Sequence, residues 1–206
     1  MSDVNPTRSV AIEMKDERRA MHEGYVFLDE KCLLLAGEIL AELGRYVGLR
    51  RELLSLHEAA LDALRAAVLR HGVQGLQVYP PADLSSSSVR RRARSLMGVR
   101  LQVAKLDGTT PSAPPAVDRS PEGEACRRAY AAVVAAAVPL ASSSGNLERL
   151  SLEYRRSVRR ARALQDVMLP ELDRSIADIE SRLEELEQED AIWMRSAASE
   201  GPAAAM

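Results

Sequence analysis

The sequence predicts a mainly α-helical protein, a long antiparallel two-helix coiled coil whose small middle head contains a short β-hairpin. Charged residues make up 28% of the 206 residues and aromatic residues only 3%, which is typical of helix-on-helix packing rather than of a thick globular core. Apolar residues recur at helical spacing near both ends of the chain, over residues 8–71 and 121–195. Because only residues 72–120 separate these two segments, the two helices are expected to fold back on each other.

Residues 8–71 are predicted to form the N-terminal helix of the coiled coil. Two columns of mostly apolar residues repeat every seventh position, and they hold Met14, Met21, Leu28, Leu35, Glu42, Leu49 and Leu56, and Arg18, Tyr25, Cys32, Ile39, Tyr46, Leu53 and Ala60. Columns sustained in this way indicate a coiled-coil seam, and the Gly72 that follows is a suitable helix cap. Four glycines inside the helix leave two interpretations open, close helix approach or a torsional hinge: Gly24, Gly37, Gly44 and Gly48.

Residues 72–120 are predicted to form the head. Leu76 precedes Pro80-Pro81 and suggests a short strand that ends there, whereas residues 85–88 are all serine and indicate a loop. Apolar residues then alternate with other residues at Val99, Leu101 and Val103, which predicts a second strand and hence a β-hairpin. The proline-rich stretch 109–121 is expected to be a loop.

Residues 121–195 are predicted to form the C-terminal helical segment, and residues 196–206 a disordered tail. One helical face of this segment carries Leu150, Tyr154, Val158, Ala161, Gln165, Met168, Leu172, Ile176, Ile179, Leu183 and Leu186. Their mean spacing is close to the roughly 3.6-residue period of an α-helix. Pro139 and the serines that follow leave open whether the helix is continuous there, and Pro170 is expected to bend it.

Charge patterning suggests a register for the two helices. If the numbers of facing residues sum to about 204, the basic residues Lys15 and Arg18 lie opposite the acidic run 184–189, and Glu42 lies near the arginines of residues 155–162. Opposite charges then match at both places. We therefore predict this register to within about one heptad.

No catalytic, cofactor-binding or metal-binding residue is predicted. His22, His57 and His71 are scattered and show no metal-ligand spacing with the two cysteines. Neither a phosphate-binding loop nor a dinucleotide-binding fingerprint occurs. The net charge of −2 gives no support for nucleic-acid or membrane binding. The sequence has no run of about 18 apolar residues, so no membrane-spanning helix is predicted. The N-terminal segment has no apolar signal core, so we expect a cytoplasmic protein.

Two features are candidate partner contacts. The first is an arginine cluster, defined as Arg155, Arg156, Arg159, Arg160 and Arg162. It is either a solvated or internally paired face, a docking surface for acidic loops, or a nucleic-acid site, and the last lacks the interleaved aromatic residues typical of such sites. The second is Trp193, which with its two apolar neighbours forms either an incidental tip or a bearing contact inside a partner.

Two segments of the chain resemble a known family. The stretch YRRSVRRARALQDVMLPELDRSIADIESRLEELEQED resembles the D subunit of V-type (archaeal and bacterial A/V-type) ATPases. The positions that match are Arg159, Arg160, Ala163, Leu164, Pro170, Leu172, Ile176, Arg182, Leu183 and Glu185. Near the N-terminus, Pro6-Thr7-Arg8 and Gly24-Tyr25, with Leu28 and Lys31, are similar to the same family. Ala161-Arg162, Asp29 and Cys32-Leu33 depart from its pattern.

The resemblance implies a central rotor shaft without an active site or cofactor. It implies that the two helices stand inside the hexamer of A and B subunits, that the head engages the F subunit, and that the lower end sits on the C subunit (named d in eukaryotes) above the membrane ring. The chain would then transmit torque in a proton- or sodium-translocating ATPase or ATP synthase, as a cytoplasmic peripheral part of a membrane-bound complex. It would not insert into the membrane or bind nucleic acid. The alternatives are a non-rotary coiled-coil adaptor, or a related F-type or flagellar-export stalk.

Overall fold

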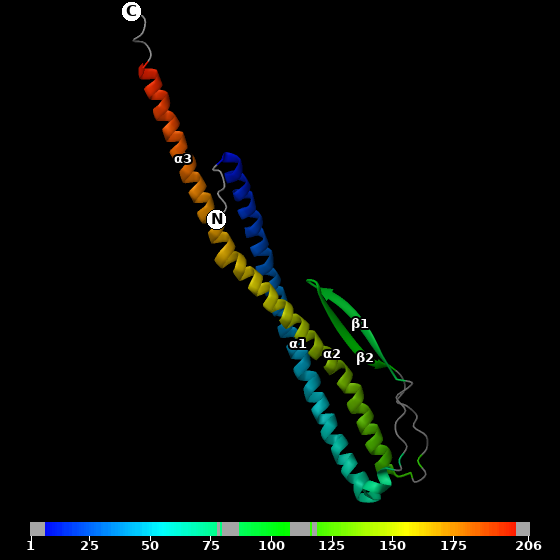
Figure 1. Ribbon diagram of the computed structural model, residues 1–206. Coiled ribbons are helices and arrows are strands. Elements are labelled where there is room, and N and C mark those ends of the chain that lie inside the picture. The colour runs from blue at the N-terminus through cyan, green and yellow to red at the C-terminus, as the bar shows by residue number, and fades with distance from the viewer. Residues whose placement is uncertain (1–6, 78, 80–86, 108–115, 117–118, 201–206) are drawn as a thin grey trace, which may run out of the picture. The chain divides into compact units, whose positions relative to one another are not determined.

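A computed structural model describes residues 7–77, 79, 87–107, 116 and 119–200 of the chain. Two long helical runs enclose one β-hairpin in the sequence (Figure 1). The elements are α1 (Arg8–Gln77), β1 (Ser88–Leu96), β2 (Val99–Asp107), α2 (Pro121–Ala163), the π-helical turn η1 (Leu164–Met168) and α3 (Leu169–Glu200). The predicted mainly α-helical fold with a small hairpin in the middle is confirmed.

The chain divides into two compact units, each described by itself. The terminal unit consists of Met1–Cys32 and Arg155–Met206, and the central unit of Leu33–Tyr154. The predicted domain boundaries at residues 71, 120 and 195 are not tested by this division and stay predictions.

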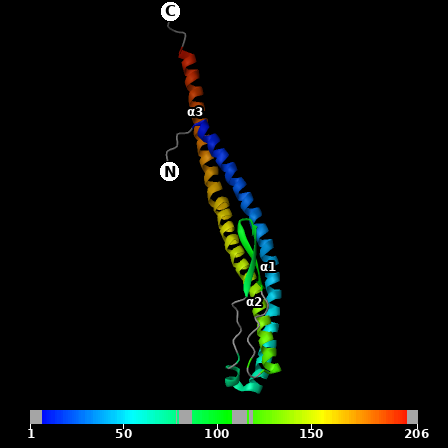
Figure 2. The ribbon, with the colours of Figure 1, turned by 90° about the vertical axis from the view of Figure 1, so that its right-hand side faces the viewer.

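In the terminal unit, the first part of α1 lies beside α3, which runs in the opposite direction (Figures 1 and 2). Ion pairs join Arg8 to Glu187, Lys15 to Glu180 and Arg18 to Asp173, so residue numbers rise along one helix as they fall along the other. Small and branched side chains are buried along this contact: Ala11, Cys32, Ala161, Ile176 and Ile179. Cys32 is a free thiol, and its burial raises the pKa of that thiol.

In the central unit, α1, α2 and the hairpin share one small core. Leu35 of α1, Leu150 of α2, and Val99 and Leu101 of β2 are buried against one another. Ile39, Leu96 and Tyr154 pack around them. The hairpin is therefore fastened to the helix pair by the apolar face of β2.

The predicted register is wrong by more than one heptad in both units. In the terminal unit, Lys15 pairs with Glu180 rather than with the acidic run 184–189, and Gly24 lies against Leu164 rather than opposite residue 180. In the central unit, Glu42 meets Asn146 rather than the arginine cluster. Acidic and basic side chains recur along both helices, and an exposed pair is worth only about 0–1 kcal/mol, so charge matching alone permits several registers.

The hairpin differs from its prediction in the first strand. β1 pairs with β2 in an antiparallel register that runs from Ser88 opposite Asp107 to Leu96 opposite Val99. Leu76, predicted to lie in the first strand, belongs to the last turn of α1, and the Pro80-Pro81 stop lies outside the described residues. Every residue of β1 before Leu96 is exposed, so its sequence carries no alternation of apolar residues that would have revealed it.

A tight turn joins the two strands. Met97 and Gly98 both have positive φ, 48° and 83°, which matches a two-residue type I′ turn. Glycine adopts this backbone readily, but methionine does so only with steric strain. Gly72 also has a positive φ, 69°, and interrupts α1 where the cap was expected, but the helix resumes and ends at Gln77.

The C-terminal helical run accommodates two prolines. α2 is continuous through Pro139, which settles the question that the sequence left open. The turn η1 ends at Met168, two residues before Pro170, and the Leu169 N–H donates to the Leu164 carbonyl five residues earlier. Proline cannot donate a backbone hydrogen bond, and its ring needs more room than a regular α-helical turn provides. A wider π-type turn at this place accommodates both requirements.

The last helix extends into the predicted tail. α3 runs through Glu200, and residues 201–206 lie outside the described part of the chain. Among the described residues, the helical run Pro121–Ser196 contains one 18-residue window with a mean hydropathy of 1.2, which by length and composition alone would suffice to cross a membrane. A single window of this kind is weak evidence for a membrane span, since apolar helices of other proteins pass the same test.

Candidate partner-binding site

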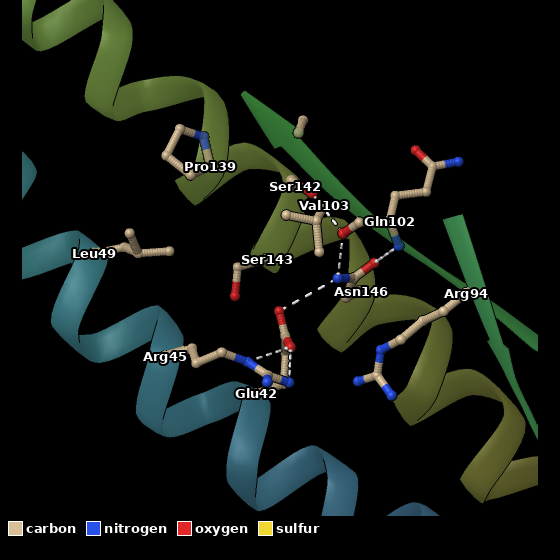
Figure 3. A pocket seen from close by; sticks show the side chains of 11 residues that line it. Glu42, Arg45, Leu49, Arg94, Gln102, Val103, Pro139, Ser142, Ser143 and Asn146 are labelled. Carbon is tan, nitrogen blue, oxygen red and sulfur yellow. Dashed lines mark hydrogen bonds and ion pairs between the residues drawn. The ribbon is translucent and has the colours of Figure 1, made fainter. Parts of the chain in front are cut away.

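A polar cluster fastens the hairpin to the two helices of the central unit, and we call it the hairpin clamp (Figure 3). Its members are Glu38, Glu42 and Arg45 of α1, Arg94 of β1, Gln102 of β2, and Ser142, Ser143, Asn146 and Arg149 of α2. A cavity of about 130 Å³ lies among most of these residues. Their carboxylate, guanidinium, amide and hydroxyl groups line it together with apolar side chains such as Leu49 and Val103, so water is a suitable occupant.

Asn146 binds the backbone of β2 as a neighbouring strand would. Its Oδ1 accepts the Gln102 N–H at 2.8 Å, and its Nδ2 donates to the Gln102 carbonyl at 2.7 Å. The Ser142 hydroxyl donates to the same carbonyl at 2.7 Å, and Arg149 donates to the Arg100 carbonyl at 3.2 Å. Side chains of α2 thus satisfy backbone groups on the edge of β2 that faces away from β1.

Glu42 places a carboxylate in the helix seam, where it is only 4% exposed. Burial alone would raise its pKa, but the Ser143 hydroxyl directed at it, Arg45 and Asn146 together hold the pKa of Glu42 below its usual value (Figure 3). Arg45 Nε donates to the carboxylate at 2.9 Å, and Asn146 Nδ2 donates at 3.3 Å. The ionised carboxylate of Glu42 therefore helps to hold α1 and α2 together.

Glu38 links the first strand to the same cluster. Its Oε1 accepts from Arg94 of β1 and, at 2.9 Å, from Arg45 of α1. The clamp therefore holds both strands, β1 through a charged side chain and β2 through its backbone. Within the described residues it contains no histidine or cysteine, and no group of three potential ligands could hold a metal ion. Its arrangement positions a structural element, and we assign it no chemical step.

The arginine cluster lies at the end of α2, in the terminal unit. All five arginines are exposed, whereas Ser157 and Ala161 on the opposite side of the helix are buried. Among the described residues, no ion pair joins any of the five to a carboxylate, so the internally paired interpretation gains no support. The cluster presents an unneutralised basic face.

Trp193 lies near the end of α3 and is 75% exposed. Its neighbours Ile192 and Met194 are also exposed, so three large apolar side chains meet solvent within one helical turn. This arrangement is compatible with the predicted contact tip, and the described residues do not cover it.

The sequence analysis missed a third heptad column on α1. Leu33, Leu40, Val47 and Leu54 follow one another at seven-residue spacing in the central unit, and all four are exposed. Leu33 and Leu40 are each 69% exposed. We call these four residues the open column. Its signal was present in the sequence, because the same spacing that revealed the seam also picks out this column.

Fold and surfaces together define a helical-hairpin protein whose exposed basic and apolar faces are suited to binding other proteins. A family model that describes the D subunit of ATP synthase matches residues 10–198. The chain therefore belongs to the family of ATP synthase D subunits.

Individual relatives agree with this assignment. The chain is 26% identical over 190 residues to the D subunit of the A-type ATP synthase of Pyrococcus abyssi, a match that covers 90% of this chain and 89% of the relative. It is 28% identical over 199 residues to the D subunit of the V-type ATP synthase of Thermotoga neapolitana, covering 93% and 95%. A match to the D subunit of the A-type ATP synthase of Methanoregula boonei, at 25% identity, covers 98% of both chains. The family resemblance predicted from the sequence is confirmed.

Proposed function

We propose that this chain is the central rotor shaft of an A/V-type ATPase or ATP synthase and transmits torque between the catalytic A/B hexamer and the membrane ring. The family assignment and the antiparallel helix pair in the terminal unit support this proposal. Paired helices resist twisting better than a single helix, because side-chain packing couples the two backbones. In this role the chain is a non-catalytic subunit, placed in the cytoplasm as a peripheral part of a membrane-bound complex.

The observation that carries the proposal is the contrast between the faces of the helices in the terminal unit. Ser157, Ala161 and Ile176 are turned inward and buried, whereas the arginine cluster is exposed and lacks ion pairs among the described residues. A shaft that turns inside a ring needs a surface that interacts with the ring without being fixed to it. We propose that the arginine cluster meets acidic loops of the A and B subunits, and that Trp193 makes an apolar contact with the same hexamer.

The open column supports a contact with another protein of the complex along α1. Apolar residues at heptad spacing on a solvated helix face accept a partner helix by the packing that forms a coiled coil. We propose that the F subunit engages the head and docks on this surface, and that the C (or d) subunit sits at the lower end of the shaft. Leu40→Glu should weaken the binding of the F subunit, whereas Leu69→Glu, which changes an exposed leucine outside the open column, should not.

The test of the rotor role is reconstitution of this chain with its A, B and F subunits. A bead attached to the central unit should turn in one direction when ATP is supplied. A disulfide between an introduced Trp193→Cys and a cysteine placed in the hexamer should stop ATP hydrolysis, and its reduction should restore it. Hydrolysis that continues at the same rate with the disulfide intact would exclude a rotating shaft and favour a non-rotary adaptor.

The arginine cluster has a separate test with a matched control. Arg159→Glu should lower the ATP hydrolysis rate coupled to rotation, because it reverses a charge that faces the acidic loops. Arg65→Glu reverses the charge of an exposed arginine in the central unit, which pairs locally with Asp62, and should have little effect on coupling. Equal coupling in the two variants would remove the cluster from the interface.

A further inference from the structure

The hairpin has one strand edge that the described part of the chain leaves open. Asn146 and Arg149 of α2 occupy the backbone groups of Gln102 and Arg100 on the outer edge of β2. β1 pairs with β2 on one side only, and no described residue bonds its backbone on the other side. An unpaired strand edge is a template for the addition of another strand.

The hydrogen-bond pattern of the hairpin shows which residues of β1 direct their backbone N–H and C=O toward that edge. Because the N–H and C=O of Gln102 point to Asn146, the facing pair of Gln102 and Ala93 exchanges no hydrogen bonds. The backbone groups of Ala93 must therefore also point away from β2. The same alternation places the N–H and C=O of four residues on the outer edge: Val89, Arg91, Ala93 and Ser95.

The edge is basic, and its two central charges have no ion-pair partner among the described residues. Arg90 pairs with Asp107 at 2.5 Å, and Arg94 pairs with Glu38 of the hairpin clamp. Arg91 and Arg92 lie between them, are exposed, and form no ion pair with any described residue. Since side chains alternate along a strand, these two guanidinium groups project from opposite faces of the sheet.

We propose that β1 binds an extended acidic segment of another protein, which adds to the hairpin as a third strand. The backbone groups of Arg91, Ala93 and Ser95 would hydrogen-bond the added strand. Carboxylates at successive positions of that strand would reach Arg91 on one face of the sheet and Arg92 on the other, within the short distance that separates cross-strand neighbours. This surface is separate from the contacts proposed for the rotor shaft, and the inference does not depend on them.

Two other occupants fit the edge less well. A second copy of this chain would bring β1 against β1 and place arginines beside arginines, which is unfavourable for facing residues of the same charge. A nucleic acid would match the charge, but residues 88–107 contain no aromatic side chain on which bases could stack. A nucleic acid would also form no strand ladder with the outward backbone N–H and C=O groups.

The test uses the full chain and a fluorescein-labelled nine-residue peptide in which pairs of adjacent glutamates alternate with pairs of threonines, so that both faces of the added strand carry carboxylates. Fluorescence anisotropy should show saturable binding that weakens as salt is added. A control peptide with the same sequence, N-methylated at every residue so that neither edge has an N–H, should bind roughly tenfold more weakly or not at all. This control keeps the charge and removes only the capacity to add as a strand.

Two variants test the same edge from the side of the protein. Ala93→Pro removes an outward N–H that β2 does not use, so it should reduce binding while hydrogen exchange in β2 stays unchanged. Arg91→Glu with Arg92→Glu should abolish binding, and Arg65→Glu with Arg70→Glu should leave it intact. If Ala93→Pro exposes β2 to exchange, the charge variant and the N-methylated peptide decide the question alone.

Three results with the peptides or the isolated chain would overturn the proposal, and a fourth concerns nucleic acid. They are the absence of saturable binding by the glutamate–threonine peptide, equal binding of the N-methylated peptide, and dimerisation of the chain through β1. Tighter binding of a labelled oligothymidylate, unaffected by Ala93→Pro, would also overturn it and assign the edge to nucleic acid instead.

Discussion

The two units of this protein hold their helices together by different means. In the terminal unit the inter-helix ion pairs are exposed, with Arg8 and Lys15 more than half exposed, and the buried side chains are small or branched. In the central unit Leu35 and Leu150 are fully buried, and a hydrogen-bonded polar cluster joins three elements.

The difference indicates where rigidity comes from. Exposed ion pairs contribute about 0–1 kcal/mol each, whereas full burial of a leucine contributes about 1.5–3 kcal/mol. A two-helix contact with little buried surface is also marginal by itself. We therefore expect the central unit to keep its structure without partners and the terminal unit to depend on the complex. Hydrogen exchange resolved along the isolated chain measures both units at once.

The largest expected effect comes from Leu150→Ala. Leu150 is fully buried against Leu35 and β2, so its truncation should destabilise the central unit by about 3 kcal/mol. Hydrogen exchange should rise in the hairpin and in the facing part of α1. The corresponding truncation in the terminal unit, Ile176→Ala, should cost less, because Ile176 is 7% exposed and lies outside the cluster of buried side chains around Leu150. Equal costs would contradict the comparison between the units.

A smaller loss is expected from Asn146→Ala. The change leaves the Gln102 N–H unsatisfied and removes one donor from the buried Glu42, which together should cost about 2 kcal/mol. The effect should appear as faster exchange in β2 and lower stability to urea. Arg149→Ala removes a more exposed bond to the same strand and should cost clearly less. If the two variants were alike, the amide of Asn146 would not be what holds the strand.

Acid should loosen the clamp as Glu42 becomes protonated. The pKa of Glu42 is lowered in the folded protein, so its contribution is present above the unfolded pKa of about 4.5 and is lost as pH falls through the folded pKa. Exchange of the hairpin amides should therefore increase below pH 4.5. In Glu42→Gln this dependence should be reduced, and an unchanged acid response would show that another group controls the hairpin.

The turn of the hairpin offers a stabilising change. Met97 has a φ of 48°, which asparagine tolerates better than methionine, so Met97→Asn should stabilise the central unit by about 0.5–1 kcal/mol. Thermal denaturation measures the gain. Met14→Asn, at a helical position of the terminal unit, should give no such gain. A loss of stability on changing Met97 would mean that packing of its side chain stabilises the fold by more than its backbone strain destabilises it.

The smallest effect is expected from the ion pairs of the terminal unit. Lys15→Ala removes a pair with Glu180 that is about half exposed on both sides, and should cost about 0.5 kcal/mol or less. Added salt should reduce even this difference. A larger cost would show that the terminal unit depends on its surface charges more than the exposure of the pair suggests.

Much of this architecture could be predicted from the sequence, because heptad columns report directly on helix pairing. The heptad column through Leu35 and the helical face through Ile176 identified the two helices, and the alternation at Val99 and Leu101 identified β2. β1 was missed because an exposed strand of arginines has no apolar face to reveal it. Only one feature of the sequence indicated the clamp, namely the charged Glu42 in an otherwise apolar column. The partners of Glu42 on the other elements could not be predicted, because no local sequence pattern identifies them.

The sequence by itself determined the class of fold and the family, since helical periodicity and family motifs are local properties of the chain. Only the tertiary structure decided the register of the helices, the position of β1 and the partners of Glu42. Many alignments of two charged helices satisfy their surface ions, but few bury Leu35 against Leu150 and give Asn146 a backbone to bind. Burial and hydrogen bonding across elements made that choice, and these depend on residues far apart in the chain.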